Sequence, residues 1–344
     1  MLHKPHLFQL LLLGLTGLAC VASAMLTGWQ RETALKRKRL DIPNARSSHT
    51  TPTPTSGGIS IVVVFLSAVL CLVLLDSLHE ETALALIGGG LLIGGVGYYD
   101  DRHDAPATLR ILVHFTAATW ALVWLGGIPP ITFGAHALDL GWLGHVIGLL
   151  ALVWLINLYN FMDGIDGLSG SEAAFVGWVG GLLLMDGSAD GLAWAARMLA
   201  AASLGFVRWN WPPARIFMGD VGSGFIGFTL GVLAIDGAQQ NATSFWSWLI
   251  LLGVFAVDAT VTLLQRARRG ARLYEAHRSH AYQHAVDRCG GHRRVTLSII
   301  TINILWLTPC AYAAHYRPNS GPLIALVALA PLLGLALYFR AGQP

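Results

Sequence analysis

Charged residues are scarce in this chain: they make up 12% of its 344 residues, whereas hydrophobic residues make up 54%. A soluble globular protein carries about 25% charged residues, so this composition excludes an ordinary soluble domain. The hydrophobic residues also come in long blocks and not in one-sided helical stripes. Together, these features predict an all-α, polytopic integral membrane protein.

Cysteines and long polar segments are also few. Three of the four cysteines lie in apolar blocks and Cys289 lies in a polar loop, so no disulfide framework is indicated. The longest polar segment, 265–295, is a basic loop of about 30 residues, too short to bury a core of its own. We find no internal repeat. We therefore expect one integral membrane domain over residues 1–344.

Eleven apolar blocks approach the roughly 20 residues that a helix needs to cross a bilayer. A basic run, LKRKRL at 35–40, follows the first block and is expected in the cytoplasm. Alternation from that point predicts the N-terminus outside and the C-terminus inside, with most lysines and arginines inside. The blocks lie near 7–28, 57–75, 82–98, 110–128, 141–159, 172–186, 191–207, 222–236, 244–264, 296–314 and 321–339.

The same alternation places four polar clusters on the cytoplasmic face. They are YYDDRHDA at 98–105, NLYNFMDGIDGL at 157–168, FMGDVGSG at 217–224 and EAHRSHAYQH at 275–284. Since the basic run alone set the alternation, the convergence of the clusters on one face argues for one active site.

The second cluster places amides and carboxylates at three-residue intervals, at Asn157, Asn160, Asp163 and Asp166. On a helix each would fall about 60° from the last, so neighbours in the series would share a face. That face could hold a hydrated divalent cation and a phosphate-bearing substrate. Mg²⁺ keeps several waters and usually takes one or two protein oxygens plus substrate phosphates. Asn160 and Asp220 would suffice as its ligands, with Mn²⁺ as an alternative ion.

The acidic pair Asp100 and Asp101 could supply a general base or a carboxylate that contacts the metal ligands without binding the ion itself. Taken alone, the pair is better explained as a solvated loop after a span. The three other clusters on the same face favour the catalytic interpretation. In FMGDVGSG the glycines permit close backbone approach, and a helix cap by Asp220 or Ser223 is the rival to a ligand role.

The 265–295 loop is rich in arginine and histidine. The positive-inside rule explains most of its arginines as residues that orient the protein in the membrane, but it does not explain the histidines. Zinc is disfavoured because the loop lacks a compact Cys/His framework. A role as hydrogen-bond donors to a diphosphate fits better, with two parallel donors from the Arg278 guanidinium and single donors from His277 and His280.

The glycine-rich run at 88–97 lies in a span and indicates close helix packing.

The motifs together resemble the polyprenyl-phosphate N-acetylhexosamine-1-phosphate transferase family. The resemblance rests on DD at 100–101, on 157–168, on NWPPARIFMGDVGSG at 210–224 and on HRSH at 277–280, and it begins at DIPNARSSH, 41–49. It implies that undecaprenyl phosphate attacks the β-phosphate of a UDP-N-acetylhexosamine and that UMP leaves. It also implies a multi-pass enzyme of the bacterial inner membrane in contact with membrane lipids, without a nucleic-acid partner. A homodimer is left open.

The resemblance also assigns roles to residues. Asn160 and Asp220 match Mg²⁺-binding positions, Asp100 the base for the lipid phosphate with Asp101 beside it, and Asp166 a position near the uracil. Substrate binding is expected from Asn157, Asp163, Asp166, Asn210, His277, Arg278 and His280. The HRSH string resembles that of the family branches that start O-antigen and enterobacterial antigen. By contrast, TPTSGG at 53–58 is closer to the branch that makes the peptidoglycan precursor. UDP-GlcNAc or a 6-deoxy relative is the expected donor.

Two other classes of protein compete with a transferase. An ion-coupled transporter is favoured only by Asp258, a carboxylate inside the apolar run LLGVFAVDATVTLL. Asp258 could instead lie near the cytoplasmic end of its span, facing the site or pairing with a basic neighbour. Transporters also tend to have repeats and broken helices, which the sequence does not indicate. The third class, an inactive scaffold, does not account for the acidic clusters.

Overall fold

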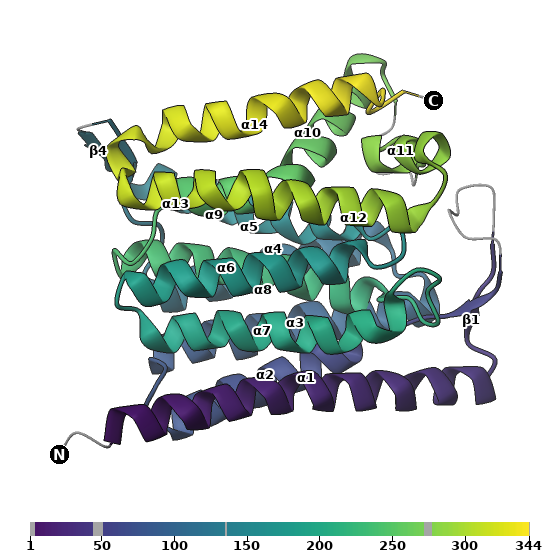
Figure 1. The fold of residues 1–344 in the computed structure, drawn as a ribbon, viewed down its shortest axis with the longest axis horizontal. Helices are drawn as coiled ribbons and strands as arrows, with labels where there is room; N and C mark the ends of the chain where they lie inside the picture. Colours follow the sequence, from purple (N-terminus) through teal and green to yellow (C-terminus); the bar gives the residue numbers. More distant parts are fainter. Residues whose placement is uncertain (1–3, 44–50, 135, 272–276, 344) are drawn as a thin grey trace.

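The computed structural model describes residues 4–43, 51–134, 136–271 and 277–343. Helices supply nearly all its regular structure and run side by side, with the two ends of the chain at opposite ends of the bundle (Figure 1). Two short antiparallel ribbons join them. One pairs β1 (Leu40–Asp41) with β2 (Thr53–Pro54), and the other pairs β3 (Ile131–Phe133) with β4 (His136–Leu138).

The helices follow the apolar blocks closely. In chain order they are α1 (Lys4–Lys36), α2 (Ile59–Leu74), α3 (Glu80–His103), α4 (Ala107–Leu125), α5 (Gly141–Met162), α6 (Leu168–Asp186), α7 (Asp190–Asn210), α8 (Asp220–Gln239), α9 (Phe245–Leu251), α10 (Gly253–Arg268), α11 (Ala281–Cys289), α12 (His292–Ile302), the π-helical turn η1 (Asn303–Leu307), α13 (Thr308–Tyr316), the short η2 (Pro318–Ser320) and α14 (Gly321–Tyr338).

Within the described part of the chain, eight helices are long and apolar enough to cross a membrane, or nine if the pair α9–α10, bent by 78°, counts as one span. Eleven spans were expected. All eleven blocks are helical, but α2 has only 16 residues and α7, which carries Arg197, does not meet the same test. The chain is an all-α, polytopic integral membrane protein, as predicted.

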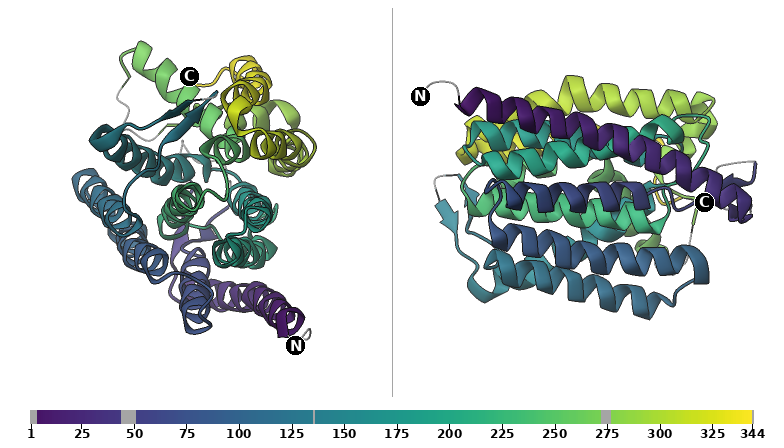
Figure 2. Two further views of the ribbon diagram at one scale, coloured as in Figure 1. Left: turned by 90° about the vertical axis from the view of Figure 1, so that its left-hand side faces the viewer. Right: turned by 90° about the horizontal axis from the view of Figure 1, so that it is seen from below.

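The interior of the bundle is built around α8. In α8, 94% of the apolar stretch is buried inside the structure, against 28–72% for the other candidate spans. Small residues let its neighbours approach: a Cβ at Gly89 of α3 would lie 2.1 Å from the Phe228 ring, and one at Gly227 would lie 2.3 Å from the Leu155 carbonyl oxygen. The glycine-rich run therefore serves helix packing, as predicted. Figure 2 shows the nearly parallel helices end on and from the side.

Gly97 sets the distance between α3 and the first turn of α8. A Cβ there would lie 2.6 Å from backbone atoms of Asp220 and Val221, which cannot turn aside as a flexible side chain could. We expect Gly97→Ala to destabilise the protein by about 1–3 kcal/mol, measured as a lower melting temperature in detergent. Gly95→Ala on the same helix is the matched control, because a Cβ at Gly95 meets nothing within 4 Å. Equal melting temperatures for the two variants would contradict this packing.

Candidate active site

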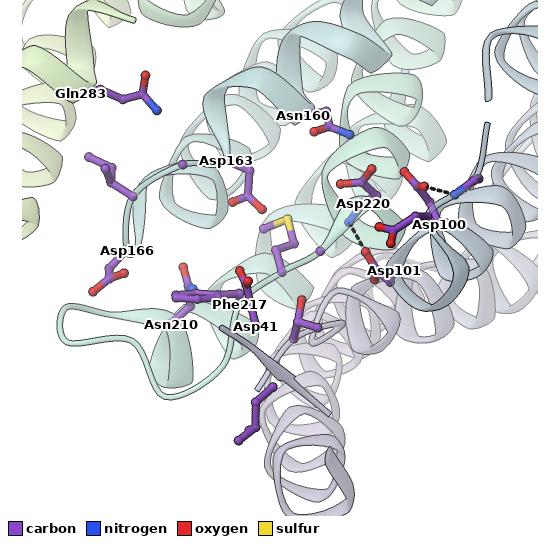
Figure 3. A pocket seen from close by; sticks show the side chains of 18 of the residues that line it. Asp41, Asp100, Asp101, Asn160, Asp163, Asp166, Asn210, Phe217, Asp220 and Gln283 are labelled. Atoms are coloured by element: carbon purple, nitrogen blue, oxygen red, sulfur yellow. Dashed lines mark hydrogen bonds between the residues drawn. The ribbon is translucent and has the colours of Figure 1, made fainter. Parts of the chain in front are cut away.

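A cavity of about 630 Å³ lies where α3 and α5 end and α8 begins (Figure 3). Its walls come from segments far apart in the sequence, so the predicted convergence of the polar clusters is confirmed for these segments. Of the predicted site residues, the cavity is lined by Asp100, Asp101, Asn160, Asp163, Asp166, Asn210 and Asp220. Asn157, His277, Arg278 and His280 do not line it.

The amide and carboxylate series does not form one helical face, contrary to the expectation from its spacing. Helix α5 ends at Met162, and Asp163 and Asp166 lie in the turn before α6. Gly167, with φ +74°, adopts the left-handed conformation in this turn, which glycine adopts at little cost. The turn is fixed from outside, because Asn210 Oδ1 accepts from the Gly167 N–H at 2.8 Å and Asp166 Oδ2 from the Ala214 N–H at 3.0 Å.

Asn157 is turned away from the cavity. Its amide nitrogen donates to the Val153 carbonyl at 2.7 Å and lies 3.4 Å from His114 Nδ1 of α4. These contacts join α4 to α5. The geometry therefore gives Asn157 a packing contact and does not support the predicted contact with substrate.

Arg110, at the start of α4, joins two of the predicted carboxylates. Its Nη1 lies 2.7 Å from Asp100 Oδ2 and 3.4 Å from Asp220 Oδ2. The other oxygen of Asp100 accepts from the Ala105 N–H at 2.7 Å. A guanidinium between two carboxylates reduces their mutual repulsion, and its unused N–H groups can meet an anionic oxygen from the cavity.

Asp101 caps α8. Its Oδ1 accepts a hydrogen bond from the Asp220 N–H at 2.7 Å, so the cap comes from α3 and not from Asp220 or Ser223. Gly219 has φ +76°, and a Cβ there would lie 2.4 Å from Asp101 Oδ2, so this position requires glycine. Asp101 thereby leaves the Asp220 side chain free to face the cavity. Asp101 thus fixes the backbone of Asp220, and its expected catalytic role stays a prediction.

The oxygen atoms in the cavity suit a divalent cation. The Asn160 and Asp220 side chains lie next to each other (Figure 3). Burial raises the pKa of Asp163 to about 8, and the charges of Asp101 and Asp166 act in the same direction. Within the described part of the chain no three His, Cys, Asp or Glu side chains form a metal site by themselves. An ion here would need water or substrate oxygens to complete its coordination, as Mg²⁺ commonly does.

The basic loop is anchored by Asp258 of α10. Asp258 Oδ1 lies 3.1 Å from His280 Nδ1 and accepts from the Ala281 N–H at 3.0 Å, while Oδ2 accepts from the Tyr282 N–H at 2.9 Å. Asp258 is thus the cap of α11. Of the alternatives for this intramembrane carboxylate, pairing with a basic neighbour is confirmed.

Two of the predicted diphosphate donors lie near Phe161, which follows Asn160 in the chain: the ring centres of His277 and His280 are 6.3 and 6.2 Å from that of Phe161. His280 is buried, the His277 ring is 4.9 Å from it, and Arg278 bonds Asp287 at 2.8 Å. Burial lowers the pKa of His277 to about 4, with His280 and Arg266 contributing, so His277 is neutral near pH 7. Contact of these three residues with substrate stays a prediction, and from the loop helix α11 only Gln283 lines the cavity.

Loss of the Asp258 cap should destabilise the loop. We expect Asp258→Ala to cost about 1–3 kcal/mol in the free energy of unfolding, because buried N–H groups lose their acceptor. Asp287→Ala is the control, since the Arg278–Asp287 pair is largely exposed and such pairs contribute about 0–1 kcal/mol. Urea titration followed by tryptophan fluorescence would measure both variants. Equal unfolding midpoints would contradict the capping role.

Several cavity residues were not among the predicted site residues. Arg110, Gln283 and His292 line it, and so does Thr55 of the first loop. Hydrogen bonds place this loop: the Phe217 N–H donates to the Pro54 carbonyl at 2.8 Å, and the Gly57 N–H to the Phe217 carbonyl at 2.9 Å. The glycines of TPTSGG were the one available signal of such a close approach. Parts of DIPNARSSH (44–49) and of EAHRSHAYQH (275–276) lie outside the described residues.

The cavity lies at the ends of apolar membrane helices and is lined by carboxylates, amides and one arginine. These features define a class of protein: an integral membrane enzyme that acts on phosphorylated substrates. The chain belongs to glycosyl transferase family 4, whose model matches residues 83–238, from α3 to α8. This confirms the resemblance seen in the motifs. The matched region contains the acidic pair, the 157–168 cluster and Asp220.

Relatives are similar over most of the chain. The decaprenyl-phosphate N-acetylglucosaminephosphotransferase of Mycolicibacterium smegmatis is 32% identical over 93% of this chain and 86% of its own length. The undecaprenyl-phosphate α-N-acetylglucosaminyl 1-phosphate transferase of Salmonella typhimurium is 32% identical over 90% and 84%. The enzyme of that name from Escherichia coli K12 is 28% identical over the same shares. These relatives give no support to a transporter.

Proposed function

We propose that this protein transfers N-acetylhexosamine 1-phosphate from a UDP-sugar to undecaprenyl phosphate and releases UMP. The observation that carries the proposal is the meeting of Asp100, Asn160, Asp220 and Arg110 in one cavity at the ends of membrane helices. The names of the relatives support a polyprenyl phosphate as acceptor. We place the cavity on the cytoplasmic face of the bacterial inner membrane, because basic residues such as those at 35–40 are concentrated at this end.

The reaction brings two anionic substrates together, so it needs neutralisation of charge more than a covalent contribution from the protein. Asn160 and Asp220 would hold Mg²⁺, or Mn²⁺ in its place, and the bound ion would neutralise phosphate charge. Arg110 would offer a guanidinium N–H to the acceptor phosphate. Asp101, through the Asp220 N–H, keeps the first turn of α8 in place.

The chemical step joins an oxygen of the lipid phosphate to the β-phosphorus of the UDP-sugar. The bond from that phosphorus to the oxygen shared with the α-phosphate breaks, and UMP departs with that oxygen. Asp100 lies 2.7 Å from Arg110 and would accept any proton still on the lipid phosphate. Direct attack is the simpler route, because this phosphate is already an anion.

The shape of the cavity supports an orientation for the donor. Asp166 and Asn210 lie at the opposite end of it from Asp100 (Figure 3). We assign that end to the nucleoside and the Asp100 end to the phosphates and the lipid. Asp163, between them, would face the diphosphate.

The proposal is tested with the purified protein, Mg²⁺, undecaprenyl phosphate and a panel of UDP-sugars that includes UDP-GlcNAc and its 6-deoxy relatives. Release of UMP with an equal amount of lipid-linked diphosphate sugar is expected for at least one donor, UDP-GlcNAc first. Release of UDP would show transfer of the sugar without its phosphate and would overturn the proposal. Solute uptake by proteoliposomes without UMP would favour a transporter.

A further inference from the structure

A second cavity, of about 260 Å³, lies among α10, α11, α12 and α14. Its lining is mostly apolar and includes Val257, Ile299, Leu332 and Phe339. It reaches the surface at Ser298 of α12 and Leu335 of α14, which are both exposed. Since α12 and α14 belong to candidate membrane spans, this surface meets lipid, and a hydrocarbon chain is the natural occupant of the cavity.

Two arginines stand at the rim of this second cavity. The Arg288 guanidinium lies 5.8 Å from the ring centre of Phe339, a lining residue, and donates to the Tyr338 carbonyl at 3.0 Å. Arg294 Nη1 donates to the carbonyl of Cys289, also a lining residue, at 3.0 Å. A guanidinium has five N–H donors, so each arginine retains donors for an anionic group. Neither arginine lines the active-site cavity.

We propose that this groove binds one acyl chain of an anionic phospholipid, with the lipid phosphate held by Arg288 and Arg294. An apolar slot open to the bilayer and two guanidinium groups at its mouth match the two parts of such a lipid. The acceptor, undecaprenyl phosphate, would bind elsewhere, because its phosphate must enter the cavity that contains Asp100 and Asp220. The groove is therefore a binding site separate from that of the acceptor.

The groove is also connected to the active site through shared residues. Asp258 and Tyr282 form part of its wall, and Asp258 caps α11. The Tyr282 hydroxyl donates to the Phe161 carbonyl at 3.0 Å, next to Asn160 in the chain. A bound acyl chain would hold this wall in place and stabilise the loop beside the active-site cavity.

The test uses the full chain in phosphatidylcholine nanodiscs that contain a phosphatidylglycerol with a photoreactive acyl chain. Cross-links mapped by mass spectrometry should fall on groove residues of α12 and α14. Arg294→Gln should lower this labelling about fivefold, as expected for one arginine contact with an anionic lipid. Arg293→Gln is the matched control, since it removes the same charge from the neighbouring position and should leave the labelling unchanged.

A third variant tests the acyl-chain slot. Ser298→Trp, at the exposed mouth, should block groove labelling while the melting temperature and the labelling elsewhere stay as they were. Equal labelling by a photoreactive phosphatidylcholine would show a non-selective lipid contact and overturn the proposal. So would displacement by unlabelled undecaprenyl phosphate at a lower mole fraction than unlabelled phosphatidylglycerol. None of these measurements depends on the proposed reaction.

Discussion

Asp220→Ala should release UMP about a hundred to a thousand times more slowly than the unaltered protein, the usual loss when a group that stabilises transition-state charge is removed. The reason is local. Asp220 is the carboxylate whose side chain lies next to that of Asn160 in the cavity, and its backbone is already fixed by Asp101. Alanine would remove a ligand of the divalent ion and leave the first turn of α8 capped.

Controls separate this effect from misfolding. Asp236→Asn changes a carboxylate on the same helix that bonds Thr82 and Gln240 outside the active-site cavity, and it should keep nearly full activity. Asp220→Asn should retain part of the activity at raised Mg²⁺, because one oxygen ligand remains. If Asp220→Ala kept its activity with the same dependence on Mg²⁺, the ligand assignment would be wrong.

Arg110→Ala is expected to have the second largest effect, a fall in kcat/KM of about a hundredfold or more. It removes the cation between Asp100 and Asp220, so their repulsion returns, and it removes a donor to the incoming phosphate. Arg110→Lys should recover part of the loss, because charge returns without the fork geometry.

Steady-state kinetics with each substrate varied in turn would locate the loss. We expect the KM for undecaprenyl phosphate to rise more than the KM for the UDP-sugar, because Arg110 lies beside Asp100. Arg102→Ala is the control: Arg102 lies over the Tyr98 ring, 3.4 Å from its centre, and does not line the cavity. An Arg110→Ala variant as active as Arg102→Ala would remove Arg110 from the mechanism.

The helices were predictable because an apolar block in lipid must satisfy its own backbone hydrogen bonds. The number of spans was harder to predict. The block near 244–264 is continuous in hydropathy, yet α9 and α10 meet at 78°. That bend places Asp258 where it can cap α11, and only tertiary contacts determine it.

Most of the cavity was visible in the sequence, since carboxylates and amides that interrupt apolar blocks are costly and therefore informative. Arg110 was missed because a lone basic residue at the start of a span resembles an orienting charge. The single helical face was wrong because the three-residue spacing was extended past the end of α5 to Asp163 and Asp166, where Gly167 turns the chain. Asn157 lies within α5, but its side chain contacts Val153 and His114. The positions of His277 and His280 depend on Asp258, which is distant in sequence.

The most direct test of the account follows the phosphorus atoms. The protein is given Mg²⁺, undecaprenyl phosphate and a UDP-N-acetylhexosamine labelled only at the phosphate next to the sugar. The label should pass into the lipid fraction, and the released nucleotide should be unlabelled UMP. Label that leaves with the nucleotide as UDP, while the sugar enters the lipid, would contradict the account.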